Sequence, residues 1–233
     1  MLQASLPLEL PQPIEPLGPK PFELEQLDLE RLGLEQLVFE HPGLNLRLQP
    51  RWLDHVQADA LLQELLSNVA WKQEHIRLFG RVHPLPRLTC WIADPGCAYR
   101  YSGLQQVVEP WTPALQALRI EISEFCGCAF NSLLLNLYRH GRDAMGCHAD
   151  DEPELEASAA IASLSLGSRR TLRFKPKSGS GLAAQSQSFA LELNHGDLLV
   201  MDPPTQQHWL HGLPRRTRIE SPRINLTFRR VRG

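Results

Sequence analysis

The amino-acid sequence predicts a mainly β protein of the α+β class, in which an antiparallel sandwich or barrel follows two helices. Two segments in the first half place apolar residues at helical spacing, and each is bounded by residues that start or stop helices. From residue 131 onward, short apolar or alternating runs follow one another between clusters of Gly, Pro, Ser and Asp. Because no helix-length segment separates these runs, antiparallel pairing is favoured over a parallel sheet. With 233 residues, the chain is long enough for one sizeable domain.

Residues 1–45 are interpreted as an appended arm, and residues 46–233 as the folded domain. The arm is dense in Pro, Leu and Glu, and it has prolines that interrupt any long helix or central strand, namely Pro7, Pro11, Pro13, Pro16, Pro19 and Pro21. Residues 1–50 carry eight acidic and three basic side chains, a balance of −5 in a chain whose net charge is −2. The arm has too many leucines for a purely solvated tail, so part of it is expected to pack either on the domain or on a partner.

The two helices are predicted from their caps as well as from their apolar stripes. Asp54 is a good N-cap for a helix that ends near Asn68. Thr112 followed by Pro113 is a good start for the second helix, and Gly127 is a natural stop. We expect both apolar stripes to face the core.

Between the helices, residues 81–103 interleave prolines and glycines with Trp91, Tyr99, Tyr101 and several arginines. Such a mixture suits a loop or hairpin that stacks on flat groups and contacts phosphates. The alternative is that these aromatic residues simply seal one sheet of an α+β protein, and composition alone would favour it.

The second half is predicted to contain short strands at residues 133–138, 161–166, 171–174, 189–193, 198–201, 208–213 and 224–230. Residues 178–188 are rich in Ser and Gly and indicate a flexible insertion between two of these strands.

Composition also excludes some classes of protein. No run approaches the roughly 20 apolar residues that cross a bilayer, and the N-terminus has no basic segment followed by an apolar one, so neither a membrane protein nor a secreted one is expected. Five cysteines form neither a disulfide framework nor a Cys-x-x-Cys pair, which fits reduced thiols: Cys90, Cys97, Cys126, Cys128 and Cys147. Residues 201–233 hold seven arginines and two acidic residues, an excess suited either to phosphates or to a solvated surface with some ion pairs.

A candidate metal site is indicated by His148-Ala-Asp150, which follows an apolar strand and a glycine-rich turn. Two residues apart at a strand end, this imidazole and carboxylate can point the same way and bind one ion. A third ligand is available at residues 208–214, where His208 and His211 would point to opposite faces of an extended strand, so only one should reach the site. Two histidines and a carboxylate with open positions form the facial triad of non-haem Fe(II) oxygenases, and the proposed ligands are His148, Asp150 and His211.

The C-terminal strand supports this interpretation. Its alternation places four polar side chains on one face, Arg223, Asn225, Thr227 and Arg229, and three apolar ones on the other. Two arginines that face a sheet interior are costly unless anions meet them, and guanidinium groups bind carboxylates in bidentate fashion. A dicarboxylate cosubstrate is such an anion. Ion pairs with Asp150 or its acidic neighbours could account for one arginine but hardly for both.

Together these motifs resemble the AlkB family of Fe(II)/2-oxoglutarate dioxygenases, especially its DNA-repair branch. The resemblance covers roughly residues 46–231 and rests on Asn136-Leu-Tyr138, His148-Ala-Asp150-Asp151-Glu152, residues 161–167, residues 208–214 and residues 222–229. It implies a double-stranded β-helix, or jelly-roll, core with flanking N-terminal helices and a nucleotide-recognition lid.

The resemblance also implies roles for individual residues. Iron would be held by His148, Asp150 and His211, and 2-oxoglutarate would be bound by Asn136, Tyr138, Arg223, Asn225 and Arg229. The last arginine of the motif would pair with the distal carboxylate, and Asp151 would pair with Arg223. The substrate base would be contacted by Tyr99, Tyr101, Trp91, Asp151 and Glu152, with Glu152 near its exocyclic amine.

The implied activity is oxidative dealkylation of N-alkylated bases such as 1-methyladenine and 3-methylcytosine in DNA. It would use Fe(II), 2-oxoglutarate and O2, and it would release formaldehyde, succinate and CO2. A base methylated on its Watson–Crick edge is unreachable inside a duplex, so we expect it to be extruded into the pocket. The expected partner is DNA, with RNA as a second candidate, and the expected state is a monomer. Its expected place is the cytoplasm, near the nucleoid, in a bacterium, or the nucleus in a eukaryote.

Other functions stay open at this point. Within the family the chain could be an RNA demethylase or a protein hydroxylase. Outside enzymes it could be a metal-free jelly roll that binds nucleic acid, although an intact triad with both arginines argues against that. A cupin-type metal enzyme would usually have more metal-binding histidines.

Overall fold

The computed structural model describes residues 22–23, 36–78, 80–97, 100–101, 104–105, 108–179 and 187–232. Most of the predicted arm, residues 1–21 and 24–35, therefore lies outside the described residues. The end of the arm, residues 36–45, lies within the large sheet, as strand β2 and the start of β3. Among the described residues, no helix is both long and apolar enough to cross a membrane.

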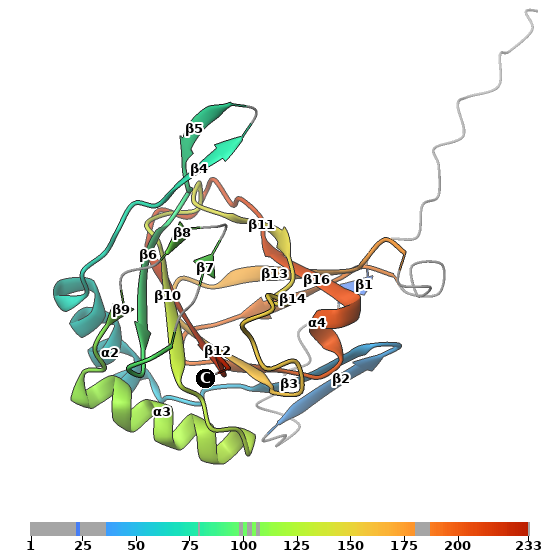
Figure 1. The fold of residues 1–233 in the computed structure, drawn as a ribbon, viewed down its shortest axis with the longest axis horizontal. Helices are drawn as coiled ribbons and strands as arrows, with labels where there is room; N and C mark the ends of the chain where they lie inside the picture. Colours follow the sequence, from blue (N-terminus) through green and yellow to red (C-terminus); the bar gives the residue numbers. More distant parts are fainter. Residues whose placement is uncertain are drawn as a thin grey trace, which may run out of the picture.

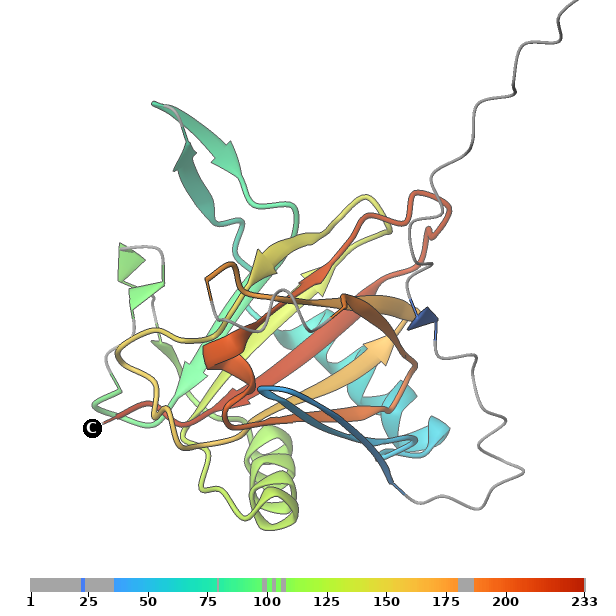
Figure 2. The same cartoon turned by 90° about the vertical axis from the view of Figure 1, so that its right-hand side faces the viewer.

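Two sheets pack face to face (Figures 1 and 2). The large sheet has the order β2-β3-β15-β12-β17-β10-β6-β9, formed by Leu37–His41, Leu44–Gln49, Leu198–Asp202, Ile161–Gly167, Arg223–Arg229, Ser132–Tyr138, Leu88–Ala93 and Val108–Glu109. The small sheet has the order β1-β14-β13-β16-β11, formed by Phe22–Glu23, Phe189–Leu193, Arg170–Pro176, Trp209–Leu213 and Met145–His148. Nearly all neighbouring strands run antiparallel, apart from β1 with β14 and β6 with β9.

Two short hairpins lie outside these sheets. The first joins β4, His75–Leu78, to β5, Arg81–Pro84, and projects from one end of the molecule (Figure 1). The second joins β7, Arg100–Tyr101, to β8, Leu104–Gln105. Both fall near or within residues 81–103, where the sequence predicts a loop or hairpin.

Two helices cover the outer face of the large sheet, and both begin at the predicted residue. In α2, His55–Asn68, Asp54 accepts from the backbone of Gln57, whose side chain accepts in return from Asp54 N. In α3, Pro113–Cys126, Thr112 is the N-cap and Gly127 ends the helix in the left-handed conformation at φ 63°. Their apolar faces join the outer side chains of β10, β12, β15 and β17 in one buried cluster.

A second apolar cluster fills the space between the sheets. It joins the inner side chains of β3, such as Leu46, to those of the small sheet, such as Phe174 and Trp209. The metal and cosubstrate residues line the part of this interior that the apolar side chains do not fill. This architecture confirms the predicted mainly β α+β class and its jelly-roll core.

Candidate active site

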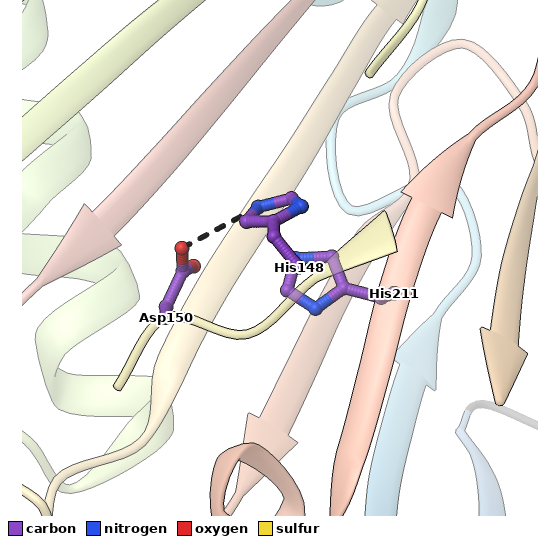
Figure 3. Close-up of side chains that lie close together, drawn as sticks. All are labelled: His148, Asp150 and His211. Atoms are coloured by element: carbon purple, nitrogen blue, oxygen red, sulfur yellow. Dashed lines mark ion pairs between the residues drawn. The ribbon is translucent and has the colours of Figure 1, made fainter. Parts of the chain in front are cut away.

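The three predicted metal ligands come together between the sheets. His148 ends β11 and His211 lies opposite it on β16, as register partners with ring centroids 4.4 Å apart. Asp150 follows β11 by two residues. One ligand atom from each of the three side chains lies within 4.8 Å of the others, and Figure 3 shows the side chains directed toward one another.

The histidine that ends β11 is oriented by its own backbone. His148 Nδ1 lies 3.0 Å from the carbonyl oxygen of Gly146. If Nδ1 carries the proton that this hydrogen bond needs, Nε2 is left with its lone pair facing Asp150, at 3.6 Å. The neighbouring strand passes close to β11, because a Cβ on Gly212 would lie only 3.0 Å from the main-chain nitrogen of Cys147.

The carboxylate of Asp150 is buried, with the residue 4% exposed, and its two oxygens have different surroundings. Oδ1 accepts from Arg229 Nη2 at 2.7 Å, and the main-chain N–H donates to Gln206 Oε1 at 2.9 Å. Oδ2 is buried without a hydrogen-bond partner among the described residues. Burial alone would raise the pKa of Asp150, but Arg229 and the two histidines outweigh burial and lower it to about 2. The group is thus an anion with one oxygen available.

The second histidine is also ready to bind a metal. Burial, together with the nearby His148, lowers the pKa of His211 to about 3, so its imidazole is neutral at ordinary pH. A neutral imidazole is the form that coordinates metals.

These features fit an Fe(II) site. Two imidazoles and one carboxylate on one side of an ion leave several positions open, as in the non-haem iron oxygenases. The buried Asp150 oxygen without a partner is what a bound cation would satisfy.

A polar ladder runs along the inner face of the large sheet, from the metal ligands toward the opposite end of β17. Asn225 Oδ1 accepts from Ser163 Oγ at 3.0 Å and from Arg223 Nη2 at 2.9 Å, and its Nδ2 donates to Thr227 Oγ1 at 2.7 Å. Arg223 Nη2 also donates to Ser165 Oγ at 2.9 Å. These partners are neutral, so the ladder aligns the arginine without neutralising it.

Asn136 and Tyr138 extend this polar face onto β10. Asn136 is the register partner of Asn225 and accepts from Arg87 Nε at 2.8 Å. Tyr138 is the register partner of Arg223, whose guanidinium carbon lies 5.6 Å from the centre of the phenol ring. The structure therefore brings all five predicted cosubstrate residues onto one face of the large sheet.

The two arginines of β17 lie at opposite ends of this face. Arg229 contacts the metal ligand Asp150, whereas Arg223 is six residues away along the strand, beside Tyr138. Since a strand advances about 3.3 Å per residue, the two Cα atoms are about 20 Å apart. A cosubstrate that is bound to iron at one end would therefore present its distal carboxylate to Arg223. The expectation that Arg229 pairs with that carboxylate does not fit this placement.

Two further expectations need correction. Asp151 does not pair with Arg223; it binds Lys177 Nζ at 2.6 Å on the exposed side of the site. His208 is not part of an extended strand, because it ends the short helix α4, Thr205–His208, and β16 begins at the next residue. His211 still reaches the site, because the inner face of β16 is set by its pairing with β11 and β13.

The predicted base-contacting residues are placed unevenly. Tyr99 lies outside the described residues, and Tyr101 lies in β7, of which only the backbone is described. Trp91 is 4% exposed and packs with Leu134 and its neighbours in a small apolar cluster. Glu152 is half-buried in the segment that follows Asp150, so it lies near the metal ligands.

Sequence reasoning missed several residues that shape the site, namely Arg87, Ser163, Ser165, Arg170, Lys177 and Gln206. The alternation within residues 161–167 could have identified both serines, because it places them on one face of an otherwise apolar strand. No comparable local pattern marks the other four.

Comparison with known proteins agrees with this geometry. The family model of the 2OG-Fe(II) oxygenase superfamily matches residues 45–229. The chain is 39% identical to DNA oxidative demethylase ALKBH2 of Mus musculus over 180 residues, which cover 75% of each protein. It is 38% identical to the alpha-ketoglutarate-dependent dioxygenase alkB homolog 3 of Homo sapiens over 188 residues, or 79% of this chain and 65% of that protein.

A solved structure of OsALKBH1 has a similar fold, with a TM-score of 0.54 and 19% identity. The similarity covers 82% of this chain and all of that one. At 19% identity this similarity supports the fold alone.

The metal triad, the arginine-bearing strand and the family match confirm the predicted cofactors, Fe(II) and 2-oxoglutarate with O2. The chain belongs to the 2OG-Fe(II) oxygenase superfamily and, within it, to the AlkB family of dioxygenases.

Proposed function

We propose that this dioxygenase repairs DNA directly, by oxidative removal of alkyl groups from base nitrogens. The proposal is carried by the cluster of His148, Asp150 and His211 next to an arginine-bearing face, in a chain 39% identical to a DNA oxidative demethylase. Bases methylated on the Watson–Crick edge, such as 1-methyladenine and 3-methylcytosine, are the proposed lesions.

The protein's first task is to hold the metal. A bound Fe(II) would supply the chemistry by which one oxygen atom of O2 enters succinate as 2-oxoglutarate loses CO2 and the other hydroxylates the N-methyl group, which then leaves as formaldehyde. Asp150 would supply an ionised oxygen, and His148 and His211 would supply neutral nitrogens. Arg229 and Gln206 fix the position of Asp150, through its carboxylate and its main-chain N–H respectively.

The second task is to orient the cosubstrate. Arg223, held by Ser165 and Asn225, would bind the distal carboxylate beside Tyr138. Burial keeps water away from this pair and strengthens its attraction. Asn136 and Arg229 would line the stretch between that end and the metal.

The third task is to bind a polyanion. Two loops next to the site carry exposed arginines. Arg142, which pairs with Glu220 at 3.5 Å, lies on one, and Arg215 and Arg218 lie on the other. The loops are joined by backbone hydrogen bonds, Gly141 N to the oxygen of Ile219 and Arg216 N to the oxygen of Gly141, both at 2.7 Å. Such a basic surface suits the phosphate backbone.

The third task includes recognition of the base, which would have to leave the duplex to reach the metal. Tyr99 and Tyr101 are the proposed stacking residues, with Trp91 as a competitor for this role. Asp151 and Glu152 are proposed to meet the exocyclic amine of the base. We propose that the enzyme acts as a monomer.

Formaldehyde release tests the proposal. Fe(II)-loaded protein is given oligodeoxynucleotides that carry 1-methyladenine or 3-methylcytosine, the same sequences as RNA, and a methylated peptide. We expect formaldehyde from the DNA, dependent on 2-oxoglutarate and absent in Asp150→Ala. Release from RNA or peptide but not from DNA would show that a different substrate class is correct.

A further inference from the structure

A second buried arginine lies beside the cosubstrate end of the site. Arg170, at the start of β13, is 2% exposed, as is Arg223. Their guanidinium carbons lie 5.8 Å and 5.6 Å from the centre of the Tyr138 ring. They come from opposite sheets, because β12 ends at Gly167, the register partner of Arg223, and the chain then crosses to β13. Two cations thus converge on one phenol from two sides of the sandwich.

The hydrogen bonds of these two arginines go to neutral oxygen atoms and not to an anion. Arg170 Nη2 donates to the main-chain oxygens of Asp143, at 3.0 Å, and Pro214, at 2.8 Å. Arg223 Nη2 donates only to the neutral side chains described above. The Nε atom of each arginine is buried without a hydrogen-bond partner, and no ion pair with a carboxylate is found for either one in the described part of the chain.

The carboxylate near Arg170 is already engaged. Asp143 accepts from Arg139 Nε at 2.8 Å and from Arg139 Nη2 at 3.0 Å, in a bidentate pair. It also accepts from the main-chain N–H of Arg139 at 2.9 Å. Arg216, which donates to Thr171 Oγ1 at 3.1 Å, adds a further positive charge to the surroundings of Arg170. Asp143 therefore balances Arg139 and leaves a surplus of positive charge inside.

A purely structural role explains only part of this arrangement. Arg170 Nη2 donates to Asp143 O and Pro214 O and so connects the two loops that follow β10 and β16. This connection explains why Nη2 is buried. It does not account for the buried Nε without a partner or for two like charges buried near one phenol ring, which are unfavourable unless an anion meets them. The missing anion is best supplied by a ligand.

We infer that Arg170 is a specificity-determining residue of the cosubstrate pocket, which acts with Arg223 to select 2-oxo acids that carry a second carboxylate. The inference rests on the proposed placement of 2-oxoglutarate with its distal end at Arg223. It implies that monocarboxylic 2-oxo acids bind poorly, because their apolar ends would leave both guanidinium groups without an anion. The product succinate, which is also a dicarboxylate, should compete at the same place.

Calorimetric titration of the Fe(II)-loaded protein without oxygen tests this inference. The ligands are 2-oxoglutarate and 2-oxopentanoate, which has the same chain length but no distal carboxylate. The variants are Arg170→Met, Arg170→Lys and Arg223→Met. Arg173→Met is the matched control, because it removes the same charge from the same strand at an exposed position.

We expect Arg170→Met to weaken 2-oxoglutarate binding at least tenfold and to leave 2-oxopentanoate binding unchanged, so the preference between the ligands falls by the same factor. Arg170→Lys, which keeps the charge, should restore most of that preference, and Arg173→Met should equal the wild type. Iron content and melting temperature are measured for each variant. If Arg170→Met does not fold, Arg170→Gln replaces it, because glutamine removes the charge but keeps an N–H donor for the two main-chain oxygens.

Two results would overturn the inference. If Arg170→Met and Arg170→Lys keep the wild-type preference while Arg223→Met loses it, Arg170 only holds the loops, and the proposed function is untouched. If the wild type itself shows no binding of 2-oxoglutarate, both the inference and the proposed cosubstrate pocket are wrong.

Discussion

The two faces of strand β17 carry opposite kinds of side chain, although they alternate along the same seven residues. On the outer face, Ile224, Leu226 and Phe228 are each 0% exposed and pack with α2 and α3 in one apolar cluster. On the inner face lie Arg223 and Arg229, which are almost equally buried but meet polar partners. The two arginines are thus nearly as buried as the apolar residues of the outer face, and the chemistry of their surroundings differs.

This difference separates stability from function within one strand. Apolar burial on the outer face stabilises the fold. On the inner face, Arg229 already has the carboxylate of Asp150, whereas the buried cation of Arg223 opposes folding until an anion binds. The same alternation fixes the strand register, because a slip by one residue would exchange the two faces. Variants on the outer face should therefore lower the free energy of unfolding, whereas variants on the inner face should weaken ligand binding.

The largest effect is expected at the metal end of the inner face. Asp150→Ala removes the ionised ligand and leaves Arg229 without its carboxylate, so iron binding and activity should fall below detection. Iron per protein, measured colorimetrically, checks this. Asp151→Ala is the control, since its carboxylate binds Lys177 outside the cluster, and it should keep its iron. Equal iron loss in both variants would contradict the assigned ligand set.

A comparably large effect of another kind is expected on the outer face. Leu226→Ala removes a fully buried side chain next to Asn225 and should lower the free energy of unfolding by about 2–5 kcal/mol. Urea denaturation measures the loss. The folded protein should still bind 2-oxoglutarate as the wild type does, and a parallel loss of affinity would show that the two faces are not separable.

Arg223→Met tests the same separation from the inner face. Loss of a buried guanidinium should weaken 2-oxoglutarate binding about 100-fold, equivalent to about 2.7 kcal/mol. Without ligand, the variant should be at least as stable as the wild type, because an apolar side chain replaces a buried cation. Arg218→Met, at an exposed site, is the control for net charge. A clear drop in the melting temperature of the ligand-free Arg223→Met variant would count against this account.

The smallest effect is expected at the helix that covers the outer face. Thr112 Oγ1 accepts from Leu115 N at 3.3 Å, and Thr112→Ala should cost about 1 kcal/mol of stability. Thr112→Ser keeps the hydroxyl and should retain most of that stability. Neither variant should alter iron or 2-oxoglutarate binding, and calorimetric titration of the folded proteins checks this.

The sequence predicted well whatever depends on near neighbours. The two helices begin and end as expected, after the N-caps Asp54 and Thr112 and, for α3, at the C-cap Gly127, because capping acts within a few residues. The alternation in residues 223–229 revealed a polar inner face for the same reason. His148, Asp150 and His211 were found because each lies in a short, distinctive motif.

The sequence could not predict what depends on distant pairing. Strand β3 pairs with β15, about 150 residues away, so the strands at the end of the Pro-rich segment were assigned to the arm. The predicted partner of Asp151 is wrong because Lys177, which lies 26 residues further along the chain, just after β13, binds Asp151 instead of Arg223. Arg170 lies in Ser168-Arg-Arg-Thr171, which has the composition of a surface turn, and only the crossover from β12 to β13 buries it.

The inner face of β17 should bind 2-oxoglutarate beside the iron ligands independently of the outer face. The most direct test of this claim is an oxygen-free titration of the Fe(II) protein with 2-oxoglutarate, followed by the weak visible charge-transfer band of the complex. We predict the band at the same midpoint in the wild type and in folded Leu226→Ala, and a midpoint about 100-fold higher in Arg223→Met. No band in the wild type, or equal shifts in the two variants, would contradict the claim.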